Sequence, residues 1–427
     1  MSSDGVGFSV PKPTDNRAGT ERAMNQLTVT TLTEACRPGG SSVLTLSTEL
    51  APAAGESAGI APARFVRGRE GTYAFETRYE TAADGSGAAV RAVVIDSKGS
   101  SLNRVETAIM AAIRDGHPVL SRVPRLEVDY GRAGTFTDLE LPHRFADGHL
   151  RAGTIDGKPT TDNPQYRALR DCTALNARPL LEASPGSLVF GAWDSTRKSQ
   201  QVRFRSALVG ETIGFLADQV TGSHIDPRGA ARWDTVAPSV RLKAEDMRTL
   251  LAQLEPELSP GNVAAIRKEI DKAGKGTVSA AALGLGAIPP SLNGLGLVSC
   301  RRVLRHHVLS FSALRQLRFG LGTDGDTAAR ALLAAYALCG LTRSYAEVVY
   351  RANCDLVEKG CPTMVLDRRF GETEEFDALT EGVADALLEE ALTAAGAFGV
   401  RWEGHILRVK GNPLISVGEA SEEDEGA

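Results

Sequence analysis

The amino-acid sequence predicts an α+β fold, and three observations lead to this class. Several segments are β-branched or alternate apolar and polar residues with the period of a strand. Other segments place apolar residues every three or four positions, as amphipathic helices do. The two kinds mix without a steady βαβ repeat, which disfavours a doubly wound parallel sheet. A chain of 427 residues could form two or three domains, or one domain with large insertions.

Each predicted element has a local reason. Alternation and β-branching predict the strands, turn formers such as ADGSG (83–87) separate them, and helical spacing predicts the helices. An apolar run at 187–193 predicts a buried strand, and the segment 203–215 is expected to run into a short helix. The other predicted elements are strands at 41–50, 71–80, 88–97 and 400–409 and helices at 24–35, about 101–115, 243–254, 261–272, 310–318, 327–340 and 374–394.

The ends of the chain and its cysteines predict a cytoplasmic protein without a membrane segment. Residues 1–23 are polar and lack the apolar core of a secretory signal, so we expect a flexible N-terminus. No apolar run approaches the roughly 18 residues that a membrane span needs. The six cysteines form no C-x-x-C pair, which indicates reduced and mostly buried thiols. Residues 416–427 are predicted to be an acidic, disordered tail.

Charge is unevenly distributed along this formally acidic chain. The net charge is −5, but the final segment EASEEDEGA alone carries five acids and no base. No Asp or Glu lies between 272 and 323, whereas 372–390 holds eight acids and no base. Such segregation allows a local anion-binding surface, although a charge run can also be an ordinary solvated face. The basic candidates are Arg301 and Arg302 in the acid-free window, and a second cluster formed by Arg197, Lys198, Arg203 and Arg205.

A predicted strand-to-helix junction, VVIDSKGSSLNRVETAIMAAI (93–113), is rich in small hydrogen-bond donors. The start of a helix offers free backbone N–H groups and a partial positive charge, so the junction could bind an anion such as phosphate. The alternative is an ordinary helix cap, in which Asn103 caps and Glu106 reaches back. The residues alone leave both interpretations open. The candidate anion-binding residues are Ser97, Lys98, Ser100, Ser101, Asn103 and Arg104.

The sequence contains no enzyme signature, and we expect neither a cofactor nor a metal site. KAGKGT lacks the upstream glycine of a phosphate-binding P-loop, and GLGAIP fails the dinucleotide fingerprint. The adjacent pair His306 and His307 would point away from each other on a helix, so it is a poor zinc pair. Asp96, Asp194 and Asp226 could act in acid–base or metal chemistry, but each lies beside turn formers, where capping is the commoner role.

Five segments, taken in order, carry a family resemblance. VIDSKGSSLNRVE (94–106) resembles a segment of the backbone subunit of type I-G (formerly I-U) CRISPR surveillance complexes, which belongs to the RAMP superfamily of RNA-binding proteins. Departures are His224 in place of an expected Arg, Asn353 in place of Gly, and Gly210 in place of Ser. The four further segments that resemble the same family are LPHRFADGHLR (141–151), SLVFGAWDS (187–195), GSHIDPRG (222–229) and YRANCDL (350–356).

The resemblance implies a ferredoxin-like, RRM-related palm with large inserted elements, the thumb and helical finger regions. It places one palm domain at 24–415, with a thumb at 272–297 or, second, at 216–240. Such subunits stack head to tail along one CRISPR RNA and present it for pairing with target DNA. The implied partners are CRISPR RNA, target DNA, neighbouring copies, a capping or RNA-processing subunit and a large subunit. The resemblance adds His143 and Arg144 to the RNA-binding candidates above.

Two other functions compete with this interpretation. RNA-cleaving relatives in type III complexes use a loop aspartate, and Asp226 in its Pro- and Gly-rich loop could do the same with a metal ion. A small-molecule enzyme is the third alternative, and it has only the pockets that any protein of this size contains. The five segments favour a non-catalytic type I subunit.

Overall fold

The computed structural model describes residues 25–67, 70–81, 85–198, 201–218, 240–286, 296–350 and 354–416. Several predictions therefore lie outside the described residues. They are the flexible N-terminus (1–23), nearly all of the acidic tail (416–427), most of the second thumb candidate (216–240), the segment around His224 and Asp226, and Asn353.

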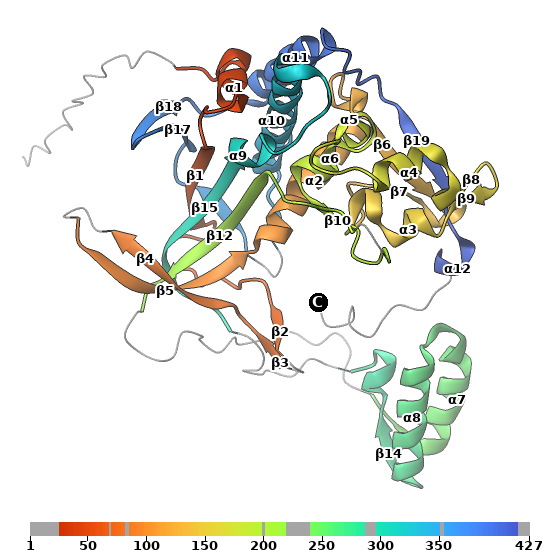
Figure 1. Ribbon diagram of the computed structural model, residues 1–427. Coiled ribbons are helices and arrows are strands. Elements are labelled where there is room, and N and C mark those ends of the chain that lie inside the picture. The colour runs from red at the N-terminus through yellow and green to blue at the C-terminus, as the bar shows by residue number, and fades with distance from the viewer. Residues whose placement is uncertain are drawn as a thin grey trace, which may run out of the picture.

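One large antiparallel sheet forms the centre of the molecule (Figure 1). Strand β1 shows why it forms: its side chains alternate between partly and fully buried, which suits a strand covered on one face. The predicted α+β class is confirmed, and the antiparallel sheet with its helices is consistent with the expected RRM-related palm with large inserted elements. The strand order is β18 (Glu372–Phe376), β17 (Thr363–Arg369), β1 (Val43–Pro52), β15 (Cys300–Ser310), β12 (Leu208–Leu216), β5 (Gly87–Asp96) and β4 (Phe75–Thr81), and β16 (Leu356–Glu358) also pairs with β1.

Helices cover one face of this sheet and bury the main core (Figure 1). The long helix α10 (Gly322–Ala346) is buried over most of its length, which fits its alanine-rich sequence. Helix α2 packs against it at Gly340, where an added Cβ would lie 2.5 Å from the Cδ1 atom of Ile109. The helices that share this face are α1 (Val29–Cys36), α2 (Lys98–Arg114), α9 (Phe311–Leu314), α10 and α11 (Glu381–Gly396).

A second, mixed sheet joins the middle of the chain to its end. Strand β19 (Ile406–Lys410) pairs in parallel with β6 (Arg125–Asp129), so the C-terminal segment completes this region. The sheet order is β7-β6-β19-β8-β9, and a separate pair, β10 and β11, leads into β12. The other elements here are β7 (Thr135–Thr137), β8 (Thr154–Ile155), β9 (Lys158–Pro159), β10 (Ala192–Trp193), β11 (Arg203–Phe204), α3 (Gly148–Arg151), α4 (Pro164–Arg170), α5 (Arg178–Ala183), α6 (Pro185–Val189) and α12 (Pro413–Ser416).

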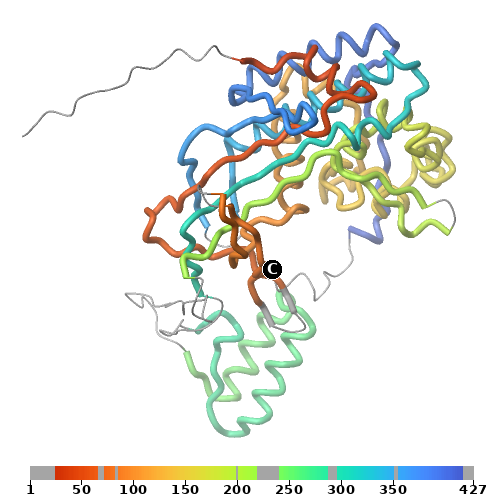
Figure 2. Tube along the Cα trace, turned by 60° about the vertical axis from the view of Figure 1, so that its left-hand side comes forward, coloured from red at the N-terminus to blue at the C-terminus, as the bar shows by residue number. Residues whose placement is uncertain are grey.

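Residues 240–286 form a small helical unit with its own core, drawn apart from the large sheet in Figure 2. Met247, Leu251, Ile266 and Ile270 are its buried centre. The first thumb candidate (272–297) begins at the end of α8, and its residues 287–295 lie outside the described part. The unit contains β13 (Arg241–Lys243), α7 (Ala244–Leu254), α8 (Pro260–Ala273) and β14 (Thr277–Ser279); elsewhere β2 (Phe65–Arg67) pairs with β3 (Glu70–Thr72), and short 3₁₀ turns are η1 (Leu120–Arg122), η2 (Gly131–Ala133), η3 (Arg144–Ala146), η4 (Thr160–Asp162), η5 (Glu255–Glu257) and η6 (Ala280–Leu283).

Three element predictions were wrong, each for a physical reason. The apolar run 187–193 begins in helix α6 and only its last two residues form the short strand β10, because a run buried on all sides has no period and Pro185 starts a helix well. The segment 203–215 contains strand β12 instead of a helix. The predicted helix 374–394 begins as strand β18, since a tight turn returns the chain beside β17, and only 381–396 is helical.

The strand β15 was missed, although it lies in the middle of the large sheet. The histidine pair His306 and His307 lies on this strand and not on a helix. Adjacent strand residues face opposite sides of a sheet, and accordingly His307 is buried while His306 is only partly so. The cations at its start, Arg301 and Arg302, obscured its apolar alternation.

Candidate nucleic-acid interface

The predicted junction is a helix N-terminus capped by Ser97. Its Oγ accepts the backbone N–H of Ser100 at 3.4 Å. The alternative cap formed by Asn103 and Glu106 is wrong, because α2 already begins at Lys98 and Glu106 is buried away from the helix start. Lys98 and Asn103 are exposed, so the helix start remains accessible to an anion.

Arg104 forms a bidentate ion pair inside the protein. Its Nε and Nη2 atoms donate to the two carboxylate oxygens of Asp96 at 3.0 and 3.2 Å. The Asp96 side chain is only 4% exposed, and the guanidinium also lies 5.0 Å from the ring centre of Tyr350. Arg104, a candidate anion-binding residue, therefore directs two of its donor groups to Asp96 in this structure.

Ser101 faces the interior and bonds to His307. Its Oγ lies 2.9 Å from His307 Nε2, and the hydroxyl of Tyr345 lies 3.0 Å from Nδ1. Burial lowers the pKa of His307 to about 3, so the ring is neutral and one hydroxyl donates while the other accepts. Gly210 is the departure that allows this arrangement, because a Cβ there would lie 2.1 Å from the imidazole.

Arg144 joins three of the similar segments. It donates to the Glu106 carboxylate at 2.6 and 2.9 Å and to the Gly191 carbonyl at 2.8 Å. Glu106 belongs to the first segment, Arg144 to the second and Gly191 to the third. Burial raises the pKa of Glu106 to about 7, and the attraction of Arg144 opposes this rise. The neighbouring His143 is exposed.

The β10–β11 hairpin carries the second basic cluster. Trp193 pairs across the strands with Arg203, whose guanidinium lies 5.4 Å from the indole ring centre. Lys198, Arg203 and Arg205 are exposed, and none of them forms an ion pair with another described residue. Arg197 instead folds back and donates to Asp171 at 2.5 Å.

Three arginines of the acid-free window, on strand β15, are paired with acids in the folded protein. Arg301 pairs with Glu80, and Arg302 lies 3.5 Å from Glu49 and 3.6 Å from Glu80. The buried Arg305 pairs with Glu358. These acids come from strands distant in sequence, so a basic window in the chain is not a basic surface on the fold. The predicted basic cluster at Arg301 and Arg302 is therefore much less available than the cluster on the hairpin.

Comparison with known families accounts for these segments. The family described as CRISPR-associated protein GSU0053 matches residues 44–219. Over these residues, which are less than half of the chain, the protein is similar to that CRISPR-associated family. The match contains the first three similar segments, and those are the segments that Arg144 joins. A search of curated proteins found no match to this chain.

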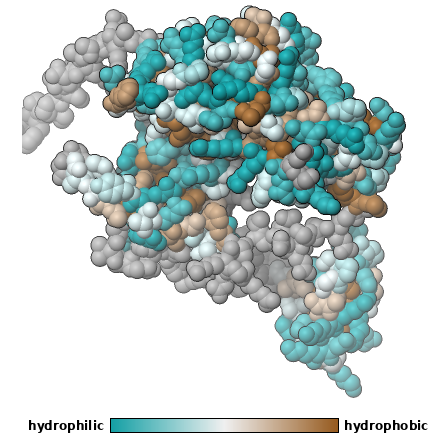
Figure 3. All heavy atoms as spheres, in the orientation of Figure 1, coloured by the Kyte–Doolittle hydropathy of each residue, from teal (hydrophilic) through white to brown (hydrophobic). Residues whose placement is uncertain are grey.

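A groove runs along α2. It has a volume of about 1280 Å³ and lies between one face of α2, the end of α10 and residues 63–65. Ser97, Ser100, Asn103 and Arg104 lie at one end of it. The face in Figure 3 is mostly hydrophilic, with small and scattered apolar patches.

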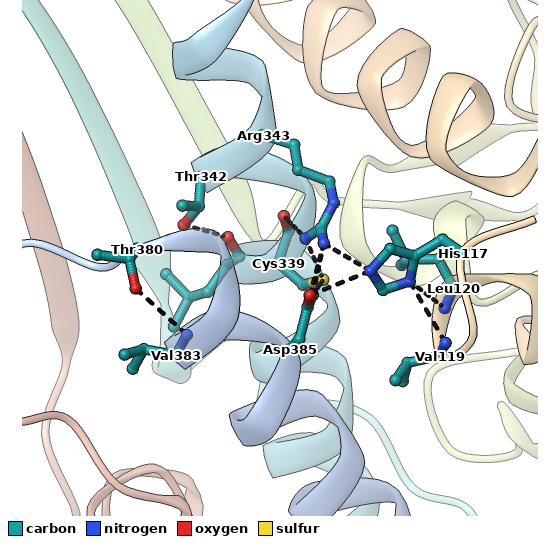
Figure 4. Close-up of polar contacts among 10 residues, drawn as sticks. His117, Val119, Leu120, Cys339, Thr342, Arg343, Thr380, Val383 and Asp385 are labelled. Atoms are coloured by element: carbon teal, nitrogen blue, oxygen red, sulfur yellow. Dashed lines mark hydrogen bonds and ion pairs between the residues drawn. The ribbon is translucent and has the colours of Figure 1, made fainter. Parts of the chain in front are cut away.

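A polar cluster lies at the other end of the groove (Figure 4). His117 Nδ1 accepts two backbone N–H groups at 3.2 and 3.3 Å, and its Nε2 lies 3.0 Å from an Asp385 carboxylate oxygen and 2.7 Å from Arg343 Nη2. Arg343 also donates to Asp385, at 2.7 Å. Burial raises the pKa of the nearby Cys339 thiol, which keeps it protonated and a weak nucleophile. We interpret the cluster as a structural link between α10, α11 and the loop after α2.

Within the described residues, no group of three or more His, Cys, Asp or Glu could hold a metal ion. In the same part of the chain, no helix combines the length and apolar character of a membrane span. All six cysteines are free and four of them are buried, as predicted. Sequence reasoning missed Trp193 and Tyr350; the first could have been found as the aromatic residue in GAWDS next to a basic cluster.

Proposed function

We propose that this protein is CRISPR-associated and is the RNA-coating backbone subunit of a type I-G surveillance complex. The observation that supports this most is the joining of three similar segments by Arg144, because the segments that define the resemblance then share one framework. The subunit would oligomerise along the CRISPR RNA and present it to target DNA in the cytoplasm. It would act by binding alone, without catalysis or a cofactor.

The RNA backbone would lie on exposed cations, since base pairing with the target supplies the sequence specificity. We assign phosphate contacts to Lys98 at the start of α2 and to Lys198, Arg203 and Arg205 on the hairpin. Ser97, Ser100, Asn103 and His143 are accessible enough to add hydrogen bonds. Ser101, Arg104, Arg144, Arg197, Arg301 and Arg302 already have partners within the chain, so we give them lower priority.

The remaining partners would bind other faces of the subunit. Head-to-tail copies use two different surfaces and generate an open helix. Helix α11 exposes Glu381, Glu389 and Glu390, which makes it a candidate for the face that meets a basic surface of the next copy. A capping or RNA-processing subunit and a large subunit would complete the complex.

The test compares two sets of charge removals in the full-length protein. Replacing Lys198, Arg203 and Arg205 with Ala should weaken RNA binding and reduce the log–log salt slope by about 2, at about 0.7 per phosphate contact. The matched control, Arg301→Ala with Arg302→Ala, removes cations that acids already neutralise, and it should change the slope less. Guides of equal length but different spacer sequence should bind alike.

Two results would count against the proposal. One is a wild-type protein that does not bind single-stranded RNA at all. The other is a strong preference for one spacer sequence, because a subunit that holds the sugar–phosphate backbone cannot distinguish spacers.

A further inference from the structure

Trp193 is an exposed indole on a basic hairpin. Its residue is 47% exposed, whereas Trp402 is 1% exposed and donates its ring N–H to the Leu181 carbonyl at 2.9 Å. The third tryptophan, Trp233, lies outside the described residues. A large aromatic ring that stays about half exposed, in a hairpin whose residues Ala192 and Phe204 are buried, calls for an explanation beyond packing.

The residues on either side of Trp193 fix the backbone that carries its indole ring. Next to Trp193, the buried Asp194 accepts hydrogen bonds from Arg170 at 2.9 Å and donates its backbone N–H to Val202 at 2.9 Å. On the other side, Ala192 pairs with the buried Phe204. The backbone beneath the indole is therefore tied to the core at both flanks, and the ring is presented outward without needing to rearrange.

The charges around the ring favour a nucleotide. The Arg203 guanidinium lies over the indole, and the exposed Lys198 and Arg205 have no ion-pair partner among the described residues. Asp194, next to Trp193 in the chain, is paired with Arg170, and Asp171 is paired with Arg197, so neither acid is left with an unpaired charge. A base can stack on an aromatic face while neighbouring cations hold its phosphates, and this combination is typical of single-strand binding.

We infer that Trp193 is a stacking platform for one base of single-stranded RNA, with Arg203 as the cation that holds both the ring and the adjacent backbone. The inference depends on the proposed function, because it takes RNA as the ligand. The proposed function assigns contacts to phosphates, and the inference adds a contact to a base. Stacking tolerates every base, so this contact is compatible with binding that ignores spacer sequence.

The experiment uses two probes with the full-length protein at low concentration: a short single-stranded RNA, and an abasic oligomer with the same sugar–phosphate backbone. Trp193→Ala should lower affinity for the RNA by roughly 5- to 150-fold, which corresponds to about 1–3 kcal/mol for one stacked base. Binding of the abasic oligomer should not change. Trp193→Phe should retain part of the affinity because a smaller ring remains.

A matched control and a spectroscopic readout separate stacking from misfolding. Phe370→Ala removes a ring that is 99% exposed in the turn between β17 and β18, and it should leave both affinities unchanged. In a Trp233→Phe background, RNA should quench the indole fluorescence of Trp193, and the abasic oligomer should not. The thermal midpoint of Trp193→Ala should match that of the wild type.

The outcomes are distinguishable. If the wild type binds RNA and Trp193→Ala binds it equally well, the stacking inference is wrong and the proposed function stands. If the wild type binds neither probe, the proposed function fails and the inference fails with it. If Trp193→Ala keeps its RNA affinity but no longer associates with other copies, the ring is a protein-docking residue and the inference is overturned.

Discussion

The start of α2 and the β10–β11 hairpin both lie in segments that resemble the CRISPR family, yet they use their charged residues differently. At the start of α2, the bonds point inward: Arg104 binds Asp96, Glu106 binds Arg144 and Ser101 binds His307. On the hairpin, Arg203 and its neighbours point into solvent beside Trp193. The segment 94–106, which has the most candidate RNA-binding residues, therefore uses most of them to hold the fold together.

Buried ion pairs and exposed phosphate contacts place different demands on the sequence. A recurring Asp…Arg or Glu…Arg pattern is what a buried ion pair requires, because each partner is costly to bury alone. An exposed phosphate contact has no such constraint, and any cation near the strand can serve. The pattern that reveals the family is therefore a poor guide to the residues that touch RNA.

The largest expected effect on stability comes from breaking the ion pair between Arg144 and Glu106. Arg144→Ala would leave Glu106 buried without its guanidinium partner, and the Gly191 carbonyl would lose a donor. We expect the free energy of unfolding to fall by about 3–5 kcal/mol, as for other broken buried ion pairs. Urea denaturation measures this change directly. If Arg144→Ala lowers the free energy of unfolding no more than the exposed control His143→Ala does, the ion pair does not stabilise the fold.

A smaller loss should follow from restoring the residue expected at position 210. Gly210→Ser places a Cβ within 2.1 Å of the His307 ring, which must move and thereby weaken its bonds to Ser101 and Tyr345. We expect a cost of about 1–3 kcal/mol, typical of overpacking. The double variant Gly210→Ser with His307→Ala should be more stable than the sum of the single effects predicts. Strict additivity in thermal unfolding would contradict the coupling.

The effect that is smallest per pH unit comes from the titration of His307. Burial lowers the folded-state pKa of His307 to about 3, below its ordinary value of 6.5, so the unfolded state binds the extra proton in that interval. The contribution of His307 therefore makes the protein less stable as pH falls from about 6.5 toward 3, by at most about 1.4 kcal/mol per pH unit. His307→Gln should flatten the stability profile in this range relative to wild type. Parallel profiles would show that the ring is not held neutral by burial.

The spacing of apolar residues in the sequence predicted many of the strands and helices, but it did not predict which charged side chains pair with each other. The strand ending at Asp96 and the helix after it could be predicted because apolar spacing is a local property. The partner of Glu106 could not, because Arg144 lies 38 residues away and only the folded chain brings the two together. The same reason explains the overestimated cation pair Arg301 and Arg302, whose acids come from other strands.

The central claim is that the hairpin binds RNA and the start of α2 holds the fold. The most direct test measures both RNA affinity and the thermal midpoint for two variants: the hairpin triple (Lys198→Ala, Arg203→Ala, Arg205→Ala) and Arg104→Ala. The account predicts that the triple loses RNA affinity at an unchanged midpoint, while Arg104→Ala lowers the midpoint because Asp96 is left buried and unpaired. The reverse result, in which Arg104→Ala abolishes RNA binding without loss of stability and the triple binds normally, would contradict it.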